Sequence, residues 1–302
     1  MTNSNSLTVA LLQHQCSDSR SDNMAKITAG IEHAAQQGAK LVLLQELHNS
    51  LYFCQTEDTA CFDLAESIPG PSTNELSSLA KQHRIVIVAS LFERRARGLY
   101  HNTAAVLDSD GSLAGIYRKM HIPDDPGYYE KFYFTPGDLG FNPIPTSVGR
   151  LGVLVCWDQW FPEAARLMTL AGADILLYPT AIGWDPNDDT AEKQRQYEAW
   201  LTIQRAHAIA NGLPVIAANR AGFEATPGNA KNGIDFWGGS FICGPQGELL
   251  AQAAHEGDEV LTTTVDYQRV ESVRRIWPYL RDRRIDAYSD ITHRYRDHTN
   301  KN

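Results

Sequence analysis

The sequence contains few cysteines and no stretch typical of export or membrane insertion. An odd, sparse set of cysteines without zinc-type spacing favours free thiols in a reducing compartment over a disulfide scaffold or a metal site. No run approaches the roughly 18 apolar residues of a membrane-spanning helix, and the N-terminus has no basic region followed by an apolar core. We therefore expect a cytoplasmic protein with no membrane partner. The five cysteines are Cys16, Cys54, Cys61, Cys156 and Cys243.

Positive charge is also scarce. The 302 residues include 27 Lys and Arg against 36 Asp and Glu, which gives a net charge of −9 at pH 7. Binding to nucleic-acid phosphates needs a positive footprint, so this balance argues against nucleic acid as the main partner. A mildly acidic surface instead suits a small cationic substrate.

Apolar runs of strand length alternate with helix-like segments, and no linker, repeat or low-complexity stretch divides them. With 43% apolar residues, the chain can bury a large core. The alternation predicts a single α/β domain over residues 1–302, with a mixed sheet or two packed sheets covered by helices. The predicted strands are 7–12, 40–45, 85–89, 100–107, 113–119, 151–155, 174–178, 214–218, 240–243, 248–251 and 260–265, and the predicted helices are 23–37, 74–83, 162–170 and 191–210.

The last 36 residues, from Tyr267, differ from the remainder in charge. They hold nine Lys or Arg and five Asp or Glu, a net charge of +4, which leaves −13 for the rest of the chain. Trp277, Tyr279, Leu280 and Ile285 lie between these charges. Aromatic and apolar residues among arginines are typical of protein interfaces. We therefore predict an interface tail from about residue 267 that docks on the acidic surface of another subunit, rather than a nucleic-acid arm.

Cys156 ends the apolar run 152–156, and Pro162 follows it where a helix is predicted to begin. A strand that ends at a cysteine, turns and enters a helix is one way to present a nucleophile, because the helix start favours the thiolate. Glu46 and Lys119 also follow predicted strands, and strand ends of an α/β sheet converge where ligands bind. Taken singly, each of these residue types more often has an ordinary structural or surface role.

Together, the three residue types form a plausible set for attack on a carbonyl carbon. A glutamate in a dry site can take the thiol proton, a lysine can stabilise a developing oxyanion, and the thiolate can form an acyl-enzyme. We predict that Glu46 is the base, Cys156 the nucleophile, and that Lys119 holds the oxyanion together with the backbone N–H of Trp157.

Residues 43–46, 117–121 and 155–158, which carry Glu46, Lys119 and Cys156, resemble the Glu-Lys-Cys motifs of the nitrilase superfamily. Residues 134–138 and the hairpin 239–247 extend the resemblance. It implies an αββα sandwich that dimerises into a four-layer αββα-αββα core, with no metal and no organic cofactor. Glu130 matches the second glutamate of that superfamily, which helps to position the lysine and the substrate.

Within the superfamily, residues 121–134 and 277–284 are most similar to N-carbamoylputrescine amidases. This resemblance implies hydrolysis of N-carbamoylputrescine to putrescine, carbon dioxide and ammonia in polyamine biosynthesis, by a homo-oligomer that is often an octamer. The loop 181–189 follows a strand near the same sheet edge. We expect Asp185 to pair with the distal ammonium of the substrate, while Trp184 and Tyr129 cover its methylenes.

Three alternatives to this prediction stay open. The acidic residues Asp185, Asp188 and Asp189 also suit a turn and an N-cap before the helix predicted at 191. Another superfamily amidase, such as an ω-amidase, a nitrilase or an N-carbamoyl-amino-acid amidohydrolase, is the rival enzyme, although an amino-acid substrate needs an arginine clamp for its carboxylate. A non-catalytic scaffold of the same fold is the third alternative.

Overall fold

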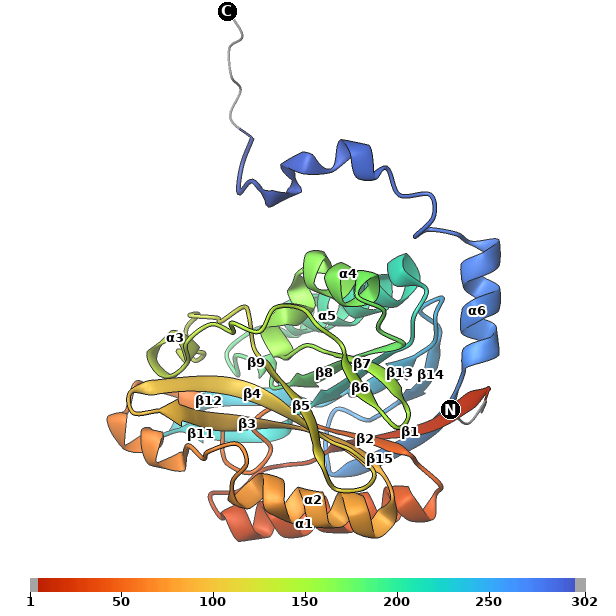
Figure 1. Cartoon of the computed structure of the whole chain (residues 1–302). Helices are drawn as coiled ribbons and strands as arrows, with labels where there is room; N and C mark the ends of the chain where they lie inside the picture. The colour runs from red at the N-terminus through yellow and green to blue at the C-terminus, as the bar shows by residue number, and fades with distance from the viewer. Residues whose placement is uncertain (1–4, 297–302) are drawn as a thin grey trace, which may run out of the picture.

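Two six-stranded sheets lie face to face in the computed structural model, which describes residues 5–296 (Figure 1). The predicted tail is thus described as far as residue 296, and its last six residues, like residues 1–4, lie outside the description. In order across the first sheet, the strands are β15 (Glu259–Asp266), β1 (Ser6–Gln13), β2 (Leu41–Leu44), β3 (Val86–Ala96), β4 (Leu99–Leu107) and β5 (Leu113–Arg118). Across the second they are β14 (Leu249–Gln252), β13 (Phe241–Cys243), β10 (Val215–Asn219), β8 (Ile175–Thr180), β7 (Gly149–Val153) and β6 (Ile144–Thr146).

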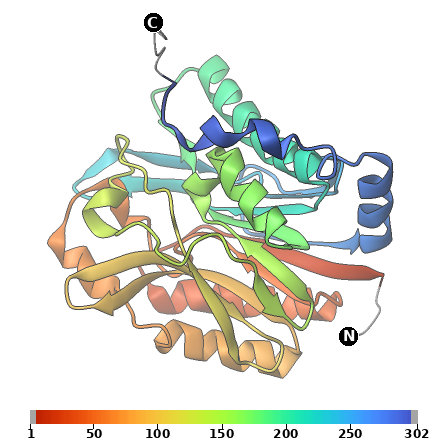
Figure 2. The ribbon, with the colours of Figure 1, turned by 45° about the horizontal axis from the view of Figure 1, so that its top comes forward.

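One pair of helices covers the outer face of each sheet. Helices α1 (Arg20–Gln36) and α2 (Pro71–His83) lie on the first sheet, and α4 (Pro162–Leu170) and α5 (Thr190–Asn211) lie on the second (Figure 1). The tilted view in Figure 2 shows the same layers. The predicted αββα sandwich is therefore confirmed.

The alternation of side chains along β1 explains the layering. Val9 and Leu11 are buried in the core between the sheets, whereas Ala10 and Leu12 are buried in a second core beneath α1 and α2. Since successive side chains of a strand point to opposite faces, a strand covered on both faces has a continuous apolar sequence. This is why the inner strands could be predicted from uninterrupted apolar runs.

The structure also contains elements that the sequence pattern did not indicate. A small third sheet joins β11 (Ala221–Thr226), β12 (Asn229–Trp237) and β9 (Gly183–Trp184). Strand β12 begins with four exposed polar or small residues, so it lacks the alternation by which a strand is recognised. A one-turn helix, α3 (Glu130–Tyr133), lies in the loop after β5.

Helix α6 (Tyr267–Ile276) occupies the start of the predicted interface tail. Val270 and Val273 are buried against the sandwich, and α6 lies beside β1 (Figure 2). The first part of the tail is therefore packed on its own domain, and the large exposed apolar side chains begin at its end: Ile276, Trp277, Tyr279, Ile285, Tyr288, Ile291 and Tyr295. None of the helices within residues 5–296 combines the length and the apolarity needed to cross a membrane.

The strand directions place several loops at one edge of the sandwich. Strands β1, β2 and β3 are parallel, and β5 runs with them because it is antiparallel to β4. In the second sheet, β7, β8 and β10 are likewise parallel. The two sheets meet at this edge, where the amide of Glu46 donates to the carbonyl of Thr180 at 3.3 Å. The C-terminal ends of β2, β5 and β7 are the ends that carry the predicted site.

Gly137 holds the end of β5 through a close backbone approach. Its amide donates to the carbonyl of Lys119 at 2.8 Å, and a Cβ on Gly137 would lie 2.1 Å from the carbonyl oxygen of Arg118.

We predict that Gly137→Ala lowers the free energy of unfolding by about 2 kcal/mol or more, since the backbone cannot move aside as a side chain can. Chemical denaturation measures this loss. Gly115→Ala is the control, because its new methyl meets only the Ile144 side chain; an equal loss in both variants would contradict the prediction.

Candidate active site

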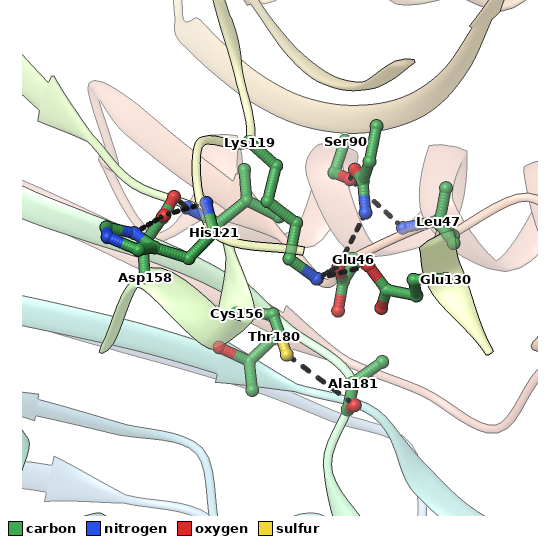
Figure 3. A network of polar contacts seen from close by, with 12 residues as sticks. Glu46, Leu47, Ser90, Lys119, His121, Glu130, Cys156, Asp158, Thr180 and Ala181 are labelled. Carbon is green, nitrogen blue, oxygen red and sulfur yellow. Dashed lines mark hydrogen bonds and ion pairs between the residues drawn. The ribbon is translucent and has the colours of Figure 1, made fainter. Parts of the chain in front are cut away.

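The predicted catalytic residues converge at this edge (Figure 3), and almost no solvent reaches them. Glu46 follows β2, Lys119 follows β5, and Cys156 begins a short 3₁₀-helix, η3 (Cys156–Trp160), after β7. Their exposed fractions are 0% for Glu46 and Lys119 and 4% for Cys156, with 1% for Glu130 on α3. Burying a charged side chain without a partner costs free energy. The contacts among these residues therefore decide which of them are charged.

Lys119 lies between two carboxylates. Its Nζ donates to Glu46 Oε1 at 2.9 Å and to Glu130 Oε2 at 2.6 Å. Burial opposes the ammonium charge, but Glu130 and Glu46 outweigh it and hold the pKa of Lys119 well above its usual value. Lys119 is therefore a charged hydrogen-bond donor at neutral pH.

Glu46 has one oxygen occupied and one free. Asn102 Nδ2 donates to the same Oε1 that Lys119 contacts, at 2.6 Å, and Ser90 Oγ in turn donates to Asn102 Oδ1 at 2.9 Å. Oε2 of Glu46 is buried and accepts no hydrogen bond within residues 5–296. A buried acceptor without a partner costs free energy, and here it is an oxygen available to take a proton.

Glu130 shares the lysine but differs from Glu46 in its surroundings. The hydroxyl of Tyr52 donates to Glu130 Oε1 at 2.7 Å. Burial, partly offset by Lys119 and then reinforced by Glu46, raises the pKa of Glu130 to about 7. Because the two carboxylates surround a single ammonium, the group of Glu46, Lys119 and Glu130 takes up one further proton near neutral pH.

Cys156 adopts a backbone conformation that side chains rarely accept. Its φ is +42°, and its thiol donates to the carbonyl of Ala181 at 3.7 Å. Burial and then Glu46 raise the pKa of Cys156 well above its usual value, although Lys119 opposes them. The expectation that the helix start favours a resting thiolate is therefore outweighed, because η3 is a short 3₁₀-helix and the site is dry. The thiol needs a base at the moment of reaction.

Asp158 ties the Cys156 turn to the segment after Lys119. It is fully buried and accepts hydrogen bonds from the amides of Val155 and His121, both at 3.0 Å, and from the hydroxyl of Tyr117 at 2.8 Å. The ring Nδ1 of His121 lies 2.6 Å from Asp158 Oδ1 (Figure 3). One carboxylate thus fixes the position of two catalytic segments relative to each other.

The amide of Trp157 lies in the first turn of a short helix, a position that suits the oxyanion role predicted for it. Trp157 is the second residue of η3, and first-turn amides of a helix have no helical acceptor. Its ring is half-buried and lies edge-on to Trp160, at 6.4 Å between centroids. The ring therefore packs within the turn, and the backbone N–H is the group that Trp157 can offer to a ligand.

A cavity of about 730 Å³ is lined by residues that neighbour the site in sequence, although none of Glu46, Lys119, Glu130 and Cys156 lines it. Tyr129, Trp184 and Asp185, all predicted to contact substrate, line it. Tyr128 lines it as well, and burial, followed by nearby Cys156 and Glu46, raises the pKa of Tyr128. The ring of Tyr128 lies 5.6 Å from that of Tyr52, whose hydroxyl contacts Glu130, so Tyr128 links the cavity wall to the buried carboxylates.

The structure separates the three aspartates of the loop 181–189. Asp189 is the N-cap of α5, accepting from the amide of Glu192 at 2.8 Å, and Asp188 accepts from Gln196 at 2.9 Å. Those two have the structural roles that were the alternative prediction. Asp185 is exposed on the cavity, with its Oδ1 also accepting from the amide of Asn187 at 2.8 Å.

Sequence reasoning missed several residues that the site uses. Asn102 had a detectable signal, since it lies between His101 and Thr103 on a predicted strand, and polar side chains that a strand buries need partners. Tyr52 had none, and the long-range partners of Tyr128 and Asp158, such as Gly183 and Tyr117, lie far away in sequence. Among the residues that the structure describes, no group of three or more His, Cys, Asp or Glu is arranged to hold a metal ion.

Comparison with known proteins agrees with this geometry. Residues 8–275 match the carbon–nitrogen hydrolase family. The chain is 44% identical over 93% of both chains to the N-carbamoylputrescine amidase of Solanum lycopersicum, and 43% identical to a citrullinase of Francisella tularensis over 95% of this chain and 98% of the other. The crystal structure of a carbon–nitrogen hydrolase from Helicobacter pylori G27 superposes with a TM-score of 0.93, with 54% identity over 96% of this chain and 100% of that one. The chain therefore belongs to the carbon–nitrogen hydrolases of the nitrilase superfamily and is a hydrolase of amide or ureido groups.

Proposed function

We propose that the chain hydrolyses N-carbamoylputrescine, a linear ureido compound with an ammonium at its far end, to putrescine, carbon dioxide and ammonia. The observation that carries the proposal is the charge of the cavity. Glu57 and Asp185 line it, and no described Lys or Arg does. Carboxylates attract the distal ammonium, while Tyr129 and Trp184 offer apolar surface to the methylenes. The similarity to the plant amidase supports the same substrate.

In the first half of the mechanism, Cys156 becomes acylated. Glu46 Oε2 takes the thiol proton as Sγ bonds to the ureido carbon, and the carbonyl electron pair moves onto oxygen. The ammonium of Lys119 and the N–H of Trp157 stabilise that oxyanion. The intermediate then re-forms the carbonyl and breaks one carbon–nitrogen bond, and Glu46 returns its proton to the leaving nitrogen.

In the second half, water releases the acyl group. Glu46 accepts a proton from the water as the water oxygen bonds to the thioester carbon. The carbon–sulfur bond then breaks, and Glu46 returns the proton to Sγ, which restores the thiol of Cys156. The product is a carbamic acid, which decomposes to carbon dioxide and an amine or ammonia. Either leaving order gives the same final products. Glu130 keeps Lys119 oriented and charged throughout.

The second candidate is hydrolysis of citrulline, which the similarity to the bacterial citrullinase favours. Citrulline also has a terminal ureido group, so the same catalytic residues serve both reactions. It differs in carrying a carboxylate at its far end. A buried or bidentate contact to that carboxylate calls for an arginine, and the cavity lining instead carries two acidic side chains.

We predict that Cys156→Ala abolishes ammonia release while thermal unfolding stays close to that of the wild type. Glu46→Gln should lower turnover by roughly 10²–10⁴-fold, the usual contribution of a general base. Cys61→Ala is the control, because Cys61 is half-exposed and lies outside the triad. Undiminished ammonia release from the Cys156 variant would refute the assignment.

The substrate is tested with N-carbamoylputrescine, citrulline, N-carbamoyl-β-alanine and an ω-amide, comparing kcat/KM. We expect N-carbamoylputrescine to be preferred. Asp185→Asn should raise its KM by about 2- to 5-fold with kcat unchanged, which is the range of an exposed ion pair, and should raise the KM of citrulline less, because the carboxylate beside the ammonium of citrulline is repelled by the same aspartate. Asp188→Asn is the matched control, since Asp188 does not line the cavity. A wild-type preference for citrulline or the ω-amide would contradict the proposal.

We also propose that the exposed apolar segment 276–296 mediates self-association, as a dimer or a larger homo-oligomer. The segment carries aromatic and apolar side chains in solvent, and its region is positive while the rest of the chain is negative. A second copy therefore supplies the complementary surface.

Removing residues 277–302 should reduce the molar mass measured by light scattering to that of a smaller assembly. The truncated chain keeps α6, so circular dichroism should stay near that of the full chain. Removing residues 297–302 alone is the control and should leave the assembly unchanged. An unaltered mass after the longer truncation would exclude this segment as the interface.

A further inference from the structure

Arg220 and Glu224 form a second buried ion pair next to the catalytic residues, and the mechanism above does not use it. Arg220 follows β10, and Glu224 lies on β11. Nη1 of Arg220 lies 2.6 Å from Glu224 Oε1, and the side chains are 0% and 3% exposed. A buried ion pair is weak evidence for stability, because desolvation of both charges offsets their attraction. A contribution to stability therefore does not by itself explain why this ion pair is buried here.

The guanidinium of Arg220 holds the loop that begins with Glu46. Nη2 donates to the carbonyls of Glu46 at 3.1 Å and Leu47 at 2.9 Å, and Nη1 donates to that of Ser50 at 2.9 Å. Three carbonyls within five residues thus share one planar, rigid set of donors. Lysine, with one compact ammonium, cannot reach all three in this arrangement.

Glu224 holds the other end of the same loop. Its Oε2 accepts from the amide of Tyr52 at 2.6 Å, and the hydroxyl of Tyr52 donates to Glu130 at 2.7 Å. The ion pair therefore contacts the backbone of residues 46–52 at both ends. Through Tyr52, it also reaches the second carboxylate around Lys119.

The loop needs such support because its backbone is strained. Leu47 has a φ of +48°, a left-handed conformation that is unfavourable for a residue with a Cβ. Such a conformation persists only where the surroundings fix it. Arg220 contacts the carbonyl of Leu47, and Ser90 Oγ accepts from its amide at 3.3 Å.

We propose that Arg220 and Glu224 are positioning residues for the general base. They hold residues 46–52 in the strained turn that directs Oε2 of Glu46 toward Cys156, and they act on the chemical step rather than on substrate binding. This inference rests on the assignment of Glu46 as base in the proposed function. The inference gives a positioning role to the region of β10 and β11, whose residues Arg220 and Glu224 do not take part in the proposed bond changes.

The test is a double-variant cycle that needs no substrate. The rate at which iodoacetamide alkylates Cys156 near neutral pH is measured by peptide mass in four proteins: wild type, Arg220→Lys, Glu46→Gln and the double variant. We expect Arg220→Lys to slow alkylation about tenfold, since a displacement of about 1 Å at a reacting group can cost as much as 10²-fold. In the Glu46→Gln background, the same change should alter the rate by less than about twofold, because the base through which Arg220 acts is already absent.

Turnover gives a second measurement. On whichever substrate the wild type hydrolyses, Arg220→Lys should lower kcat by a similar factor and leave KM within about twofold. Arg205→Lys is the matched control, because Arg205 Nε also donates to a backbone carbonyl, that of Gly247 at 2.7 Å, but Arg205 lies on α5, which covers the outer face of the second sheet (Figure 1). If Arg220→Lys fails to fold, Glu224→Gln replaces it, with a smaller loss in the same pattern.

Two outcomes would overturn the inference. Equal slowing in both backgrounds would mean that Arg220 only supports the fold, and an unchanged alkylation rate in the wild-type background would mean that it does not position Glu46. These outcomes are distinct from failure of the proposed function. A wild type that ignores N-carbamoylputrescine would refute the substrate, while the alkylation cycle would still decide the role of Arg220.

Discussion

The ammonium of Lys119, buried between Glu46 and Glu130, is the interaction on which the rest of the site depends. Three ionisable groups are withdrawn from water at that point, which is costly unless each is paired. The 2.9 Å and 2.6 Å contacts pair them, and the cost explains why so many neighbouring groups are arranged around them. The lysine must stay charged to stabilise an oxyanion, while one carboxylate oxygen must stay free to accept a proton. The geometry meets both demands because the two side chains that donate to the Glu46 carboxylate, Lys119 and Asn102, both contact Oε1 and leave Oε2 unoccupied.

That arrangement is held by strained backbone at two places. Cys156 and Leu47 both have positive φ values, +42° and +48°, and each lies beside a buried carboxylate or ion pair. Asp158 braces the turn of Cys156, and Arg220 braces the turn after Glu46. Polar networks of this kind are favourable only when nearly every member is satisfied. Within the group around Lys119, the oxygen without a partner is Oε2 of Glu46, the atom that the chemistry requires.

The sequence allowed prediction of the parts that depend on local pattern. Continuous apolar runs revealed the inner strands, Pro162 marked the first residue of α4, and the rule that strand ends converge brought Glu46, Lys119 and Cys156 together. The supporting residues could not be predicted, because their meaning lies in contacts across the chain. Arg220 follows a predicted strand, yet nothing local indicates that it contacts a loop 170 or more positions earlier. The same holds for Glu224 on β11, a strand that the apolar pattern did not indicate.

Substrate choice depends on a different kind of interaction from catalysis. The buried groups act on the ureido carbon, which N-carbamoylputrescine and citrulline share, so they cannot discriminate between the two. Under the proposed function, discrimination falls to Glu57 and Asp185 on the open cavity, where each ion pair would contribute only about 0.2–1 kcal/mol because water and salt screen it. Each carboxylate would then favour a cationic substrate several-fold. Stronger selectivity requires that the cavity rim be drier than it is in one chain, and covering by a second subunit is the kind of change that removes that water.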